Sequence, residues 1–227
     1  MTANSQPPST DSRAQLHDWR QICQALAQQQ AEDEAFAAWP IEDGATVPFQ
    51  HRWEHVMEVA RIALGLAEET GADLEIVEAA AWLHDVRKEQ SKHAEAGARE
   101  ARQILYDTDF PTDKIEAVVE AIRRHSGSVR PRGAPSLEPL EAAVLWDADK
   151  LSKLGVSALS HRLSSHTYVG MSLHERRAEL DEYVHDKVRK IVESMNTEPA
   201  RRYAEERYAA MVQMLDAWLR EEDEPKA

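Results

Sequence analysis

The sequence has few residues of several types, and each shortage excludes a class of protein. Among 227 residues there is one cysteine, Cys23, so no disulfide can form within the chain. No stretch approaches the ~18 uninterrupted apolar residues that a membrane-spanning helix needs. The N-terminal segment MTANSQPPSTDSR lacks the apolar core of a secretory signal peptide. We therefore expect a protein of the reducing cytoplasm with no membrane partner.

Basic residues are outnumbered by acidic ones. The chain has 27 Lys and Arg against 41 Asp and Glu, a net charge of -14 before any histidine is protonated. Proteins that bind long nucleic acids usually gain affinity from a net basic surface that displaces counterions from phosphates. The acidic balance argues against such a partner, whereas a small anionic substrate is compatible with it.

Glycine is scarce as well, with eight residues, and helix-forming Ala, Leu, Glu and Arg dominate the segments between turn residues. Alternating β-branched runs are almost absent, so the sequence predicts an all-α fold. The breaks at proline and glycine divide it into helices. We expect these at about 12–39, 50–70, 73–85, 93–106 and 111–125, from 141 onward with a break near Gly155, and at 173–194 and 198–220.

The composition along the chain predicts one domain with short tails. Residues 1–12 are polar and contain two adjacent prolines, so we expect a flexible tail. Residues 13–222 then form a single helical domain, and 223–227 form an acidic tail. The proline-rich segment 126–139 predicts a loop long enough to suggest function. An apolar stripe on the last helix fits packing within the chain as easily as a homodimer.

The most informative residues are His84 and Asp85, at the C-terminal end of the helix expected at 73–85. That helix contains AAAWL and is apolar nearly all round, which predicts the central, buried helix of the fold. An imidazole and a carboxylate at such a place need partners. Residues of suitable chemistry stand on other predicted helices or at their ends: His55, His93, His125 and Asp149.

In order, these residues read His, His-Asp, His, His, Asp, and this pattern resembles the HD superfamily of metal-dependent phosphohydrolases. The resemblance extends over residues 51–154, and each motif has its local context: HRWEHVMEVA, AAAWLHDVRK, HAEAGA, AIRRHS and DADKL. A bare His-Asp dipeptide would be a weak signal, whereas the full pattern is specific. It implies a bundle of helices whose metal ligands converge on one central cleft.

The ligands that this resemblance implies suit a divalent transition metal. One ion would use His55, His84, Asp85 and Asp149. The additional histidines, His93 and His125, imply a second ion, with Asp85 as the bridge because a carboxylate has two oxygens. Imidazole and carboxylate together suit Fe, Mn, Co, Ni or Zn, with Mg also compatible, and the lack of cysteine ligands argues against a soft thiolate site.

Asp149 is predicted to complete the site because the family's last ligand stands in an Ala-Asp-x-Leu context. Asp147 lies about 200 degrees away around a helix and cannot face the same metal. It would accept hydrogen bonds behind the site or lie on the surface. His51 shares a helix face with His55 and is a support for the ligands, a substrate contact or a plain surface residue. The remaining histidines match no ligand position and are expected on the surface or in the core: His17, His161, His166, His174 and His185.

Several cations are placed to bind a phosphate. Lys88 follows the His-Asp doublet by three residues, so it returns near the metal site and could neutralise a phosphate oxygen. The segment RRHSGSVRPR contains four arginines without an acid, and guanidinium groups bind phosphate bidentately. We predict Lys88, Arg124, Arg130 and Arg132 as substrate-binding residues. The other reading is a solvated basic loop that balances acids such as Glu116 and Glu120.

The resemblance implies a hydrolase that cleaves a small phosphate ester or anhydride, plausibly of a nucleotide, by attack of metal-bound hydroxide on phosphorus. Asp85 and Lys88 would be its catalytic residues. Two alternatives remain. Some HD proteins use the same ligands for a mixed-valence di-iron oxygenase, and an HD scaffold can also act as a nucleotide-binding regulatory protein without turnover.

Overall fold

The computed structural model describes residues 17–39 and 46–222 and, within them, an all-α fold. The predicted tails, 1–12 and 223–227, lie outside these ranges. The N-terminal elements are α1 (Trp19–Ala38), α2 (His51–Thr70), α3 (Leu74–Leu83), α4 (His93–Tyr106), the 3-10 turn η2 (Thr112–Lys114), α5 (Ile115–Arg124) and α6 (Leu140–Leu151). The C-terminal elements are α7 (Val156–Leu163), the 3-10 turn η3 (His166–Tyr168), α8 (Leu173–Glu182), the π-helical segment η4 (Tyr183–Val188), α9 (Arg189–Val192) and α10 (Glu198–Glu222).

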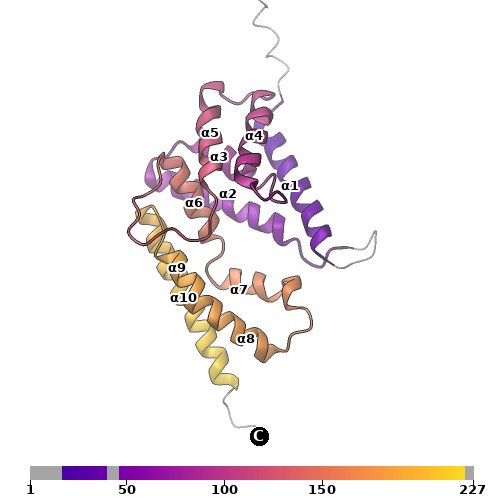
Figure 1. The fold of residues 1–227 in the computed structure, drawn as a ribbon, viewed down its shortest axis with the longest axis vertical. Coiled ribbons are helices and arrows are strands. Elements are labelled where there is room, and N and C mark those ends of the chain that lie inside the picture. Colours follow the sequence, from indigo (N-terminus) through magenta and orange to yellow (C-terminus); the bar gives the residue numbers. More distant parts are fainter. Residues whose placement is uncertain (1–16, 40–45, 223–227) are drawn as a thin grey trace, which may run out of the picture.

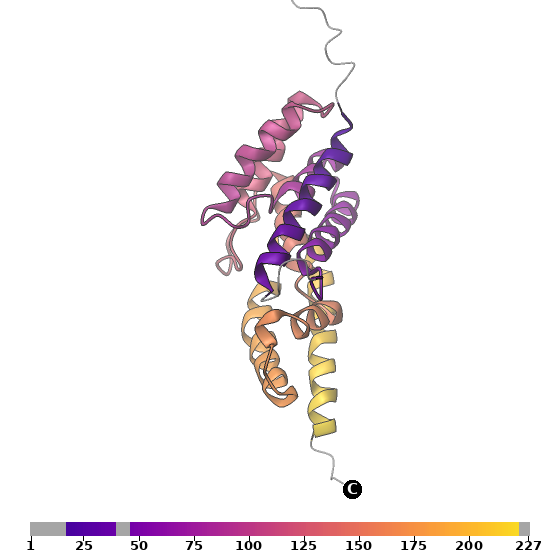
Figure 2. The ribbon, with the colours of Figure 1, turned by 90° about the vertical axis from the view of Figure 1, so that its right-hand side faces the viewer.

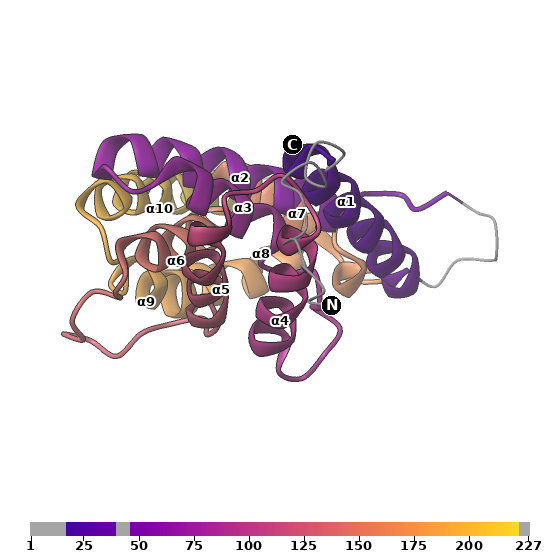
Figure 3. The ribbon, with the colours of Figure 1, turned by 90° about the horizontal axis from the view of Figure 1, so that it is seen from above.

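The helix α3 is the centre of the core, as its apolar sequence predicts. It packs against α1, α2, α5 and α6, and seen from above it lies between α2 and α5 (Figure 3). Ala79, Ala80, Ala81 and Leu83 are fully buried. The carboxylate of Asp73 caps its first turn by accepting hydrogen bonds from two backbone N–H groups. The residues that follow Leu83 therefore leave a helix that is enclosed by its neighbours.

The remaining helices extend this bundle in one direction. In Figure 1, α1 to α6 form the upper part of the molecule, and α7, α8 and the C-terminal half of α10 lie below it. The side view shows α10 running beside α8, and these two helices are in contact (Figure 2). In the region between the two parts, α7 packs on α10. It thereby forms a wall beside the N-terminal half of α2.

Several predicted boundaries need correction. The first helix begins at Trp19, because Asp18 caps it, while the backbone carbonyl of His17 accepts a hydrogen bond from Asp109. The third helix ends at Leu83, and the His-Asp doublet lies in the turn that follows. The helix expected at 173–194 contains a π-helical segment in its middle, a feature that periodicity does not reveal.

The apolar stripe on α10 is mostly core. Ala204, Met211 and Leu215 are buried, whereas Leu219 is 40% exposed near the end of the helix. Among the described residues, no helix combines the length and the apolar character needed to cross a membrane.

Candidate metal centre

The predicted ligands come from five different helices and meet beside the C-terminal end of α3. His55 lies on α2, and Asp149 lies on α6. His84 directly follows the last residue of α3, and Asp85 comes next. The other two occupy helix ends: His93 is the first residue of α4, and His125 directly follows α5. Because helix ends converge here, residues far apart in the sequence reach a common point.

Asp85 lies between two pairs of histidines and presents one carboxylate oxygen to each pair. Its Oδ2 is 3.4 Å from Nε2 of His84 and 3.8 Å from Nε2 of His55. Its Oδ1 is 3.5 Å from Nε2 of His125 and 4.0 Å from Nε2 of His93. Asp149 joins the first pair, with Oδ1 at 3.4 Å from Nε2 of His55. The result is two groups of potential ligands that share one carboxylate.

The histidine rings are held with Nε2 directed at the carboxylates. Nδ1 of His84 is 2.7 Å from the carbonyl oxygen of Ala81, so it carries the ring proton and donates it. Nδ1 of His125 makes the same contact with the carbonyl of Ile122. Both Nε2 atoms are buried and have no hydrogen-bond partner. A buried lone pair without a partner is costly, and a metal ion would satisfy it.

Protonation in the cluster also suits metal binding. Burial lowers the pKa of His55 well below its usual range and lowers the pKa values of His93 and His125. Burial alone would raise the pKa of Asp85, but contacts with its histidine neighbours and Arg52 hold it well below its usual range. These shifts favour neutral imidazoles at His55, His93 and His125 and an ionised carboxylate at Asp85, the forms that bind metals. The donor set and its protonation fit a divalent transition metal.

Cationic side chains surround the two carboxylates. Nζ of Lys88 donates a hydrogen bond of 3.0 Å to Oδ1 of Asp85, which places this predicted residue at the centre. Arg52 donates to Oδ2 of the same carboxylate at 2.9 Å and to Glu34 at 2.6 Å. Just beyond the C-terminal end of α6, Lys153 donates to Oδ1 of Asp149 at 2.7 Å.

Lys150 is a second cation on Asp149. Its amino group is buried and hydrogen-bonds to the other oxygen of this carboxylate. Burial would raise the pKa of Asp149, but Lys153 and Lys150 hold it well below its usual range. The sequence prediction missed Arg52, Lys150 and Lys153. Lys153 stands four residues after Asp149, in the turn that follows α6, and this spacing is the signal that would have found it.

Asp147 faces away from the centre, as the helical rotation predicts. Its carboxylate is fully buried and accepts four hydrogen bonds of 2.8 to 2.9 Å from the backbone and side chains of Asn196 and Thr197. These residues directly precede α10. Asp147 therefore ties the start of α10 to α6, and of the two aspartates Asp149 is the one that faces the histidines.

The arginines of the segment 123–132 contact several groups of the protein itself. Arg123 and Arg124 both pair with Glu120, one helical turn earlier, as in the alternative reading. Arg130 donates to the side chain of Asn196 and to the carbonyl oxygen of Pro135. These contacts commit the guanidinium groups to partners within the protein. Arg132 is exposed, and phosphate binding by Arg124, Arg130 and Arg132 stays a prediction.

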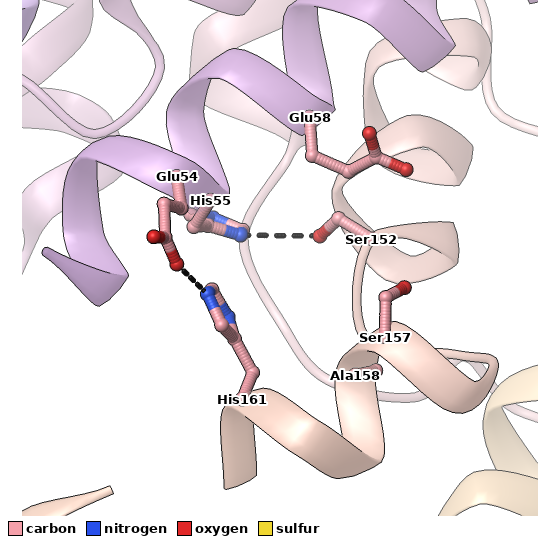
Figure 4. A pocket seen from close by; sticks show the side chains of 7 residues that line it. All are labelled: Glu54, His55, Glu58, Ser152, Ser157, Ala158 and His161. Carbon is pink, nitrogen blue, oxygen red and sulfur yellow. Dashed lines mark hydrogen bonds and ion pairs between the residues drawn. The ribbon is translucent and has the colours of Figure 1, made fainter. Parts of the chain in front are cut away.

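Open space adjoins the centre on the side of α7. A pocket of about 190 Å³ is lined by residues of α2, among them His55, by residues of α7, and by Ser152 (Figure 4). A neighbouring pocket of about 120 Å³ shares these two residues and adds Lys153, Arg162 and Tyr183. A small molecule in this space would lie against His55 and Lys153, so the centre is accessible from this side.

Replacing Ser152 by alanine is expected to weaken metal binding by ~10-fold or more, because groups that orient metal-ligating histidines contribute this much. The Ser152 hydroxyl donates to the carbonyl of Asp149 at 2.8 Å and lies 3.1 Å from Nδ1 of His55, so its oxygen accepts a hydrogen bond from Nδ1–H. Ser157→Ala is the matched control, since Ser157 lines the same pocket. Competition with a chelator measures both variants, and equal affinities would contradict the role of Ser152.

Comparison with known proteins identifies the family of this chain. Residues 52–154 match the model of the HD domain. The uncharacterized protein YpgQ of Bacillus subtilis is 30% identical over 168 residues, which cover 73% of this chain and 81% of YpgQ. The chain therefore belongs to the HD-domain family.

Solved structures show the same fold. The crystal structure of B. subtilis YpgQ in complex with ADP matches with a TM-score of 0.63 and 23% identity, over 90% of this chain and 97% of YpgQ. A predicted HD-superfamily hydrolase from an uncultured Thermotogales bacterium matches with a TM-score of 0.53 and 26% identity, over 85% of this chain and 91% of that one. The protein thus has the fold of HD-superfamily hydrolases.

Proposed function

We propose that the protein is a metal-dependent phosphohydrolase that cleaves a phosphate ester or anhydride of a nucleotide. The observation that carries this proposal is the position of Asp85, whose two oxygens each face a pair of histidines. Two ions in such a centre supply an activated water nucleophile and stabilise the negative charge that develops at phosphorus. The centre would bind them through His55, His84, His93, His125, Asp85 and Asp149.

The lysines give the centre a means of binding phosphate. Lys88 and Lys153 each donate to a carboxylate oxygen that a metal ion would also use. With cations on these oxygens the ammonium groups would be repelled, and both side chains are partly exposed and free to turn. A phosphate group of the substrate would then be their natural partner. Lys153 also lines the adjoining pocket, so we place the substrate there.

The nucleotide is supported by similarity and by charge. YpgQ, which is similar over most of both chains, has been crystallised with ADP. A net charge of -14 makes a long nucleic acid an unfavourable partner, while locally clustered lysines suit a small phosphorylated molecule. In the reaction, water would add to phosphorus, the bond from phosphorus to the leaving oxygen would break, and a proton would pass to that oxygen.

A screen of nucleoside mono-, di- and triphosphates with the metal-loaded protein tests this function. Chromatography of the products distinguishes release of phosphate from release of pyrophosphate. Lys88→Met is expected to lower kcat/KM by ~10²-fold with unchanged metal content, because it removes a group that stabilises charge at the phosphate. Absence of turnover with every nucleotide, under each metal tested, would refute the proposal.

A further inference from the structure

A second group of potential ligands lies outside the centre, where α7 approaches the start of α2. His51 and Glu54 stand one turn apart on α2, and His161 faces them from α7. One nitrogen or oxygen from each side chain lies within 4.8 Å of the other two. We propose that these three residues form a separate site for one tetrahedral transition-metal ion, with zinc as the ion of matching chemistry.

The hydrogen bonds of His51 leave a bare nitrogen directed toward this group. The Ser164 hydroxyl donates to the carbonyl of Ser160 at 2.9 Å, so its oxygen accepts from Nε2 of His51, 3.3 Å away. With the ring proton on Nε2, Nδ1 has a lone pair. Nδ1 is buried without a hydrogen-bond partner, 3.9 Å from a carboxylate oxygen of Glu54. A lone pair that faces a carboxylate is unfavourable unless a cation lies between them.

Neighbouring side chains hold the two rings in place. Phe49 stacks on His51 with ring centroids 5.4 Å apart and planes inclined by 2°. The ring of His161 stands edge-on to that of His51, with centroids 4.5 Å apart. Figure 4 shows Glu54 and His161 directed at one another, and Nε2 of His161 hydrogen-bonds to the same Glu54 oxygen that lies near His51. The site is thus oriented before any ion binds.

The chemistry of the three ligands matches zinc. Two imidazoles and one carboxylate are an established zinc ligand set, and a fourth position stays open for water. Bonds of ~2.1 Å in a tetrahedron separate ligand atoms by ~3.4 Å, so rotations of about 1 Å at these partly exposed side chains complete the geometry. His51 and Glu54 are one turn apart on α2, and His161 already contacts Glu54 from α7. Metal binding therefore needs no movement of the helices.

An ion here would act on the wall of the substrate pocket. Glu54 from α2 and His161 from α7 line the pocket that contains His55, and their side chains meet there (Figure 4). Binding one cation to both would tie α7 to α2 and fix the width of this opening. The site is distinct from the HD centre, since none of its three residues belongs to the two ligand groups around Asp85.

Counting bound metal tests the proposal. Metal-free protein is loaded with Co²⁺ or Zn²⁺, and the bound ions are counted after removal of the excess. His161→Ala is expected to bind one ion fewer per chain than the unmodified protein, and the lost Co²⁺ should have the intense visible absorption of a tetrahedral site. Glu54→Gln, which keeps the size of the side chain, is expected to lose the same ion, with a fall in affinity of ~10²-fold or more.

His174→Ala is the matched control, because His174 is an exposed histidine that pairs with a single carboxylate, that of Glu222. It should bind as many ions as the unmodified protein. Repeating the count with Asp85→Ala, alone and combined with His161→Ala, separates this ion from those of the HD centre. Equal metal content with and without His161, in both backgrounds, would overturn the proposed site whether or not the protein is a phosphohydrolase.

Discussion

Asp85→Ala protein is expected to bind almost no metal at the HD centre and to release product at least ~10³-fold more slowly than the unmodified protein. The magnitude follows from the several kcal/mol that metal ions contribute to stabilising charge at phosphorus, at 1.36 kcal/mol per tenfold in rate. Asp85 faces both pairs of histidines, so its removal affects both groups of ligands.

Two further variants are expected to lose only part of the bound metal. Asp85→Asn keeps one carboxamide oxygen and is expected to retain at most one ion. His93→Ala removes the most exposed ligand, with 24% of its side chain accessible, and is expected to reduce mainly the second ion. Metal analysis, circular dichroism and product release are measured on the same samples. A folded Asp85→Ala protein with full metal content would contradict the assignment of the centre, whereas loss of metal without any activity to lose would contradict only the proposed reaction.

The core and the cluster could be predicted because their signals are local. An apolar block between turn residues predicts a central helix, and a His-Asp doublet at the end of that helix needs buried partners. The spacing of Asp147 and Asp149 likewise predicts opposite faces of one helix. Family resemblance supplied the remaining ligands, and the structure brings all six together.

The surroundings of the centre could not be predicted in the same way. Arg52 reaches Asp85 across the space between two helices, and its other partner, Glu34, lies on a third. Such a contact depends on how the helices cross. Arg123 and Arg124 pair with Glu120, one helical turn earlier, in line with the reading of a basic loop that balances nearby acids, and phosphate binding by this segment stays a prediction. His161, expected as an ordinary surface or core residue, approaches His51 only through the packing of α7.

The second large effect concerns Asp147, for which we expect Asp147→Asn to lower the free energy of unfolding by ~3–5 kcal/mol. The buried carboxylate accepts from four donors, all in Asn196 and Thr197. An asparagine of the same shape would turn an N–H group toward donors that it cannot satisfy. The junction between α6 and the start of α10 would lose its charge-assisted hydrogen bonds.

Asp149→Asn is the matched comparison, with the same change two residues away on the same helix. Its carboxylate faces His55 and the lysines, so the expected result is loss of metal from the HD centre. Folded Asp147→Asn protein should retain that metal. In the part of the chain that the structure describes, the carboxylate of Asp147 bonds to Asn196 and Thr197 and not to the histidines of the centre. Denaturant unfolding gives the stability of each variant, and metal analysis of the folded fraction gives its content. If Asp147→Asn lost the metal and kept its stability, the orientation of α6 described above would be wrong, since the two aspartates would have exchanged roles.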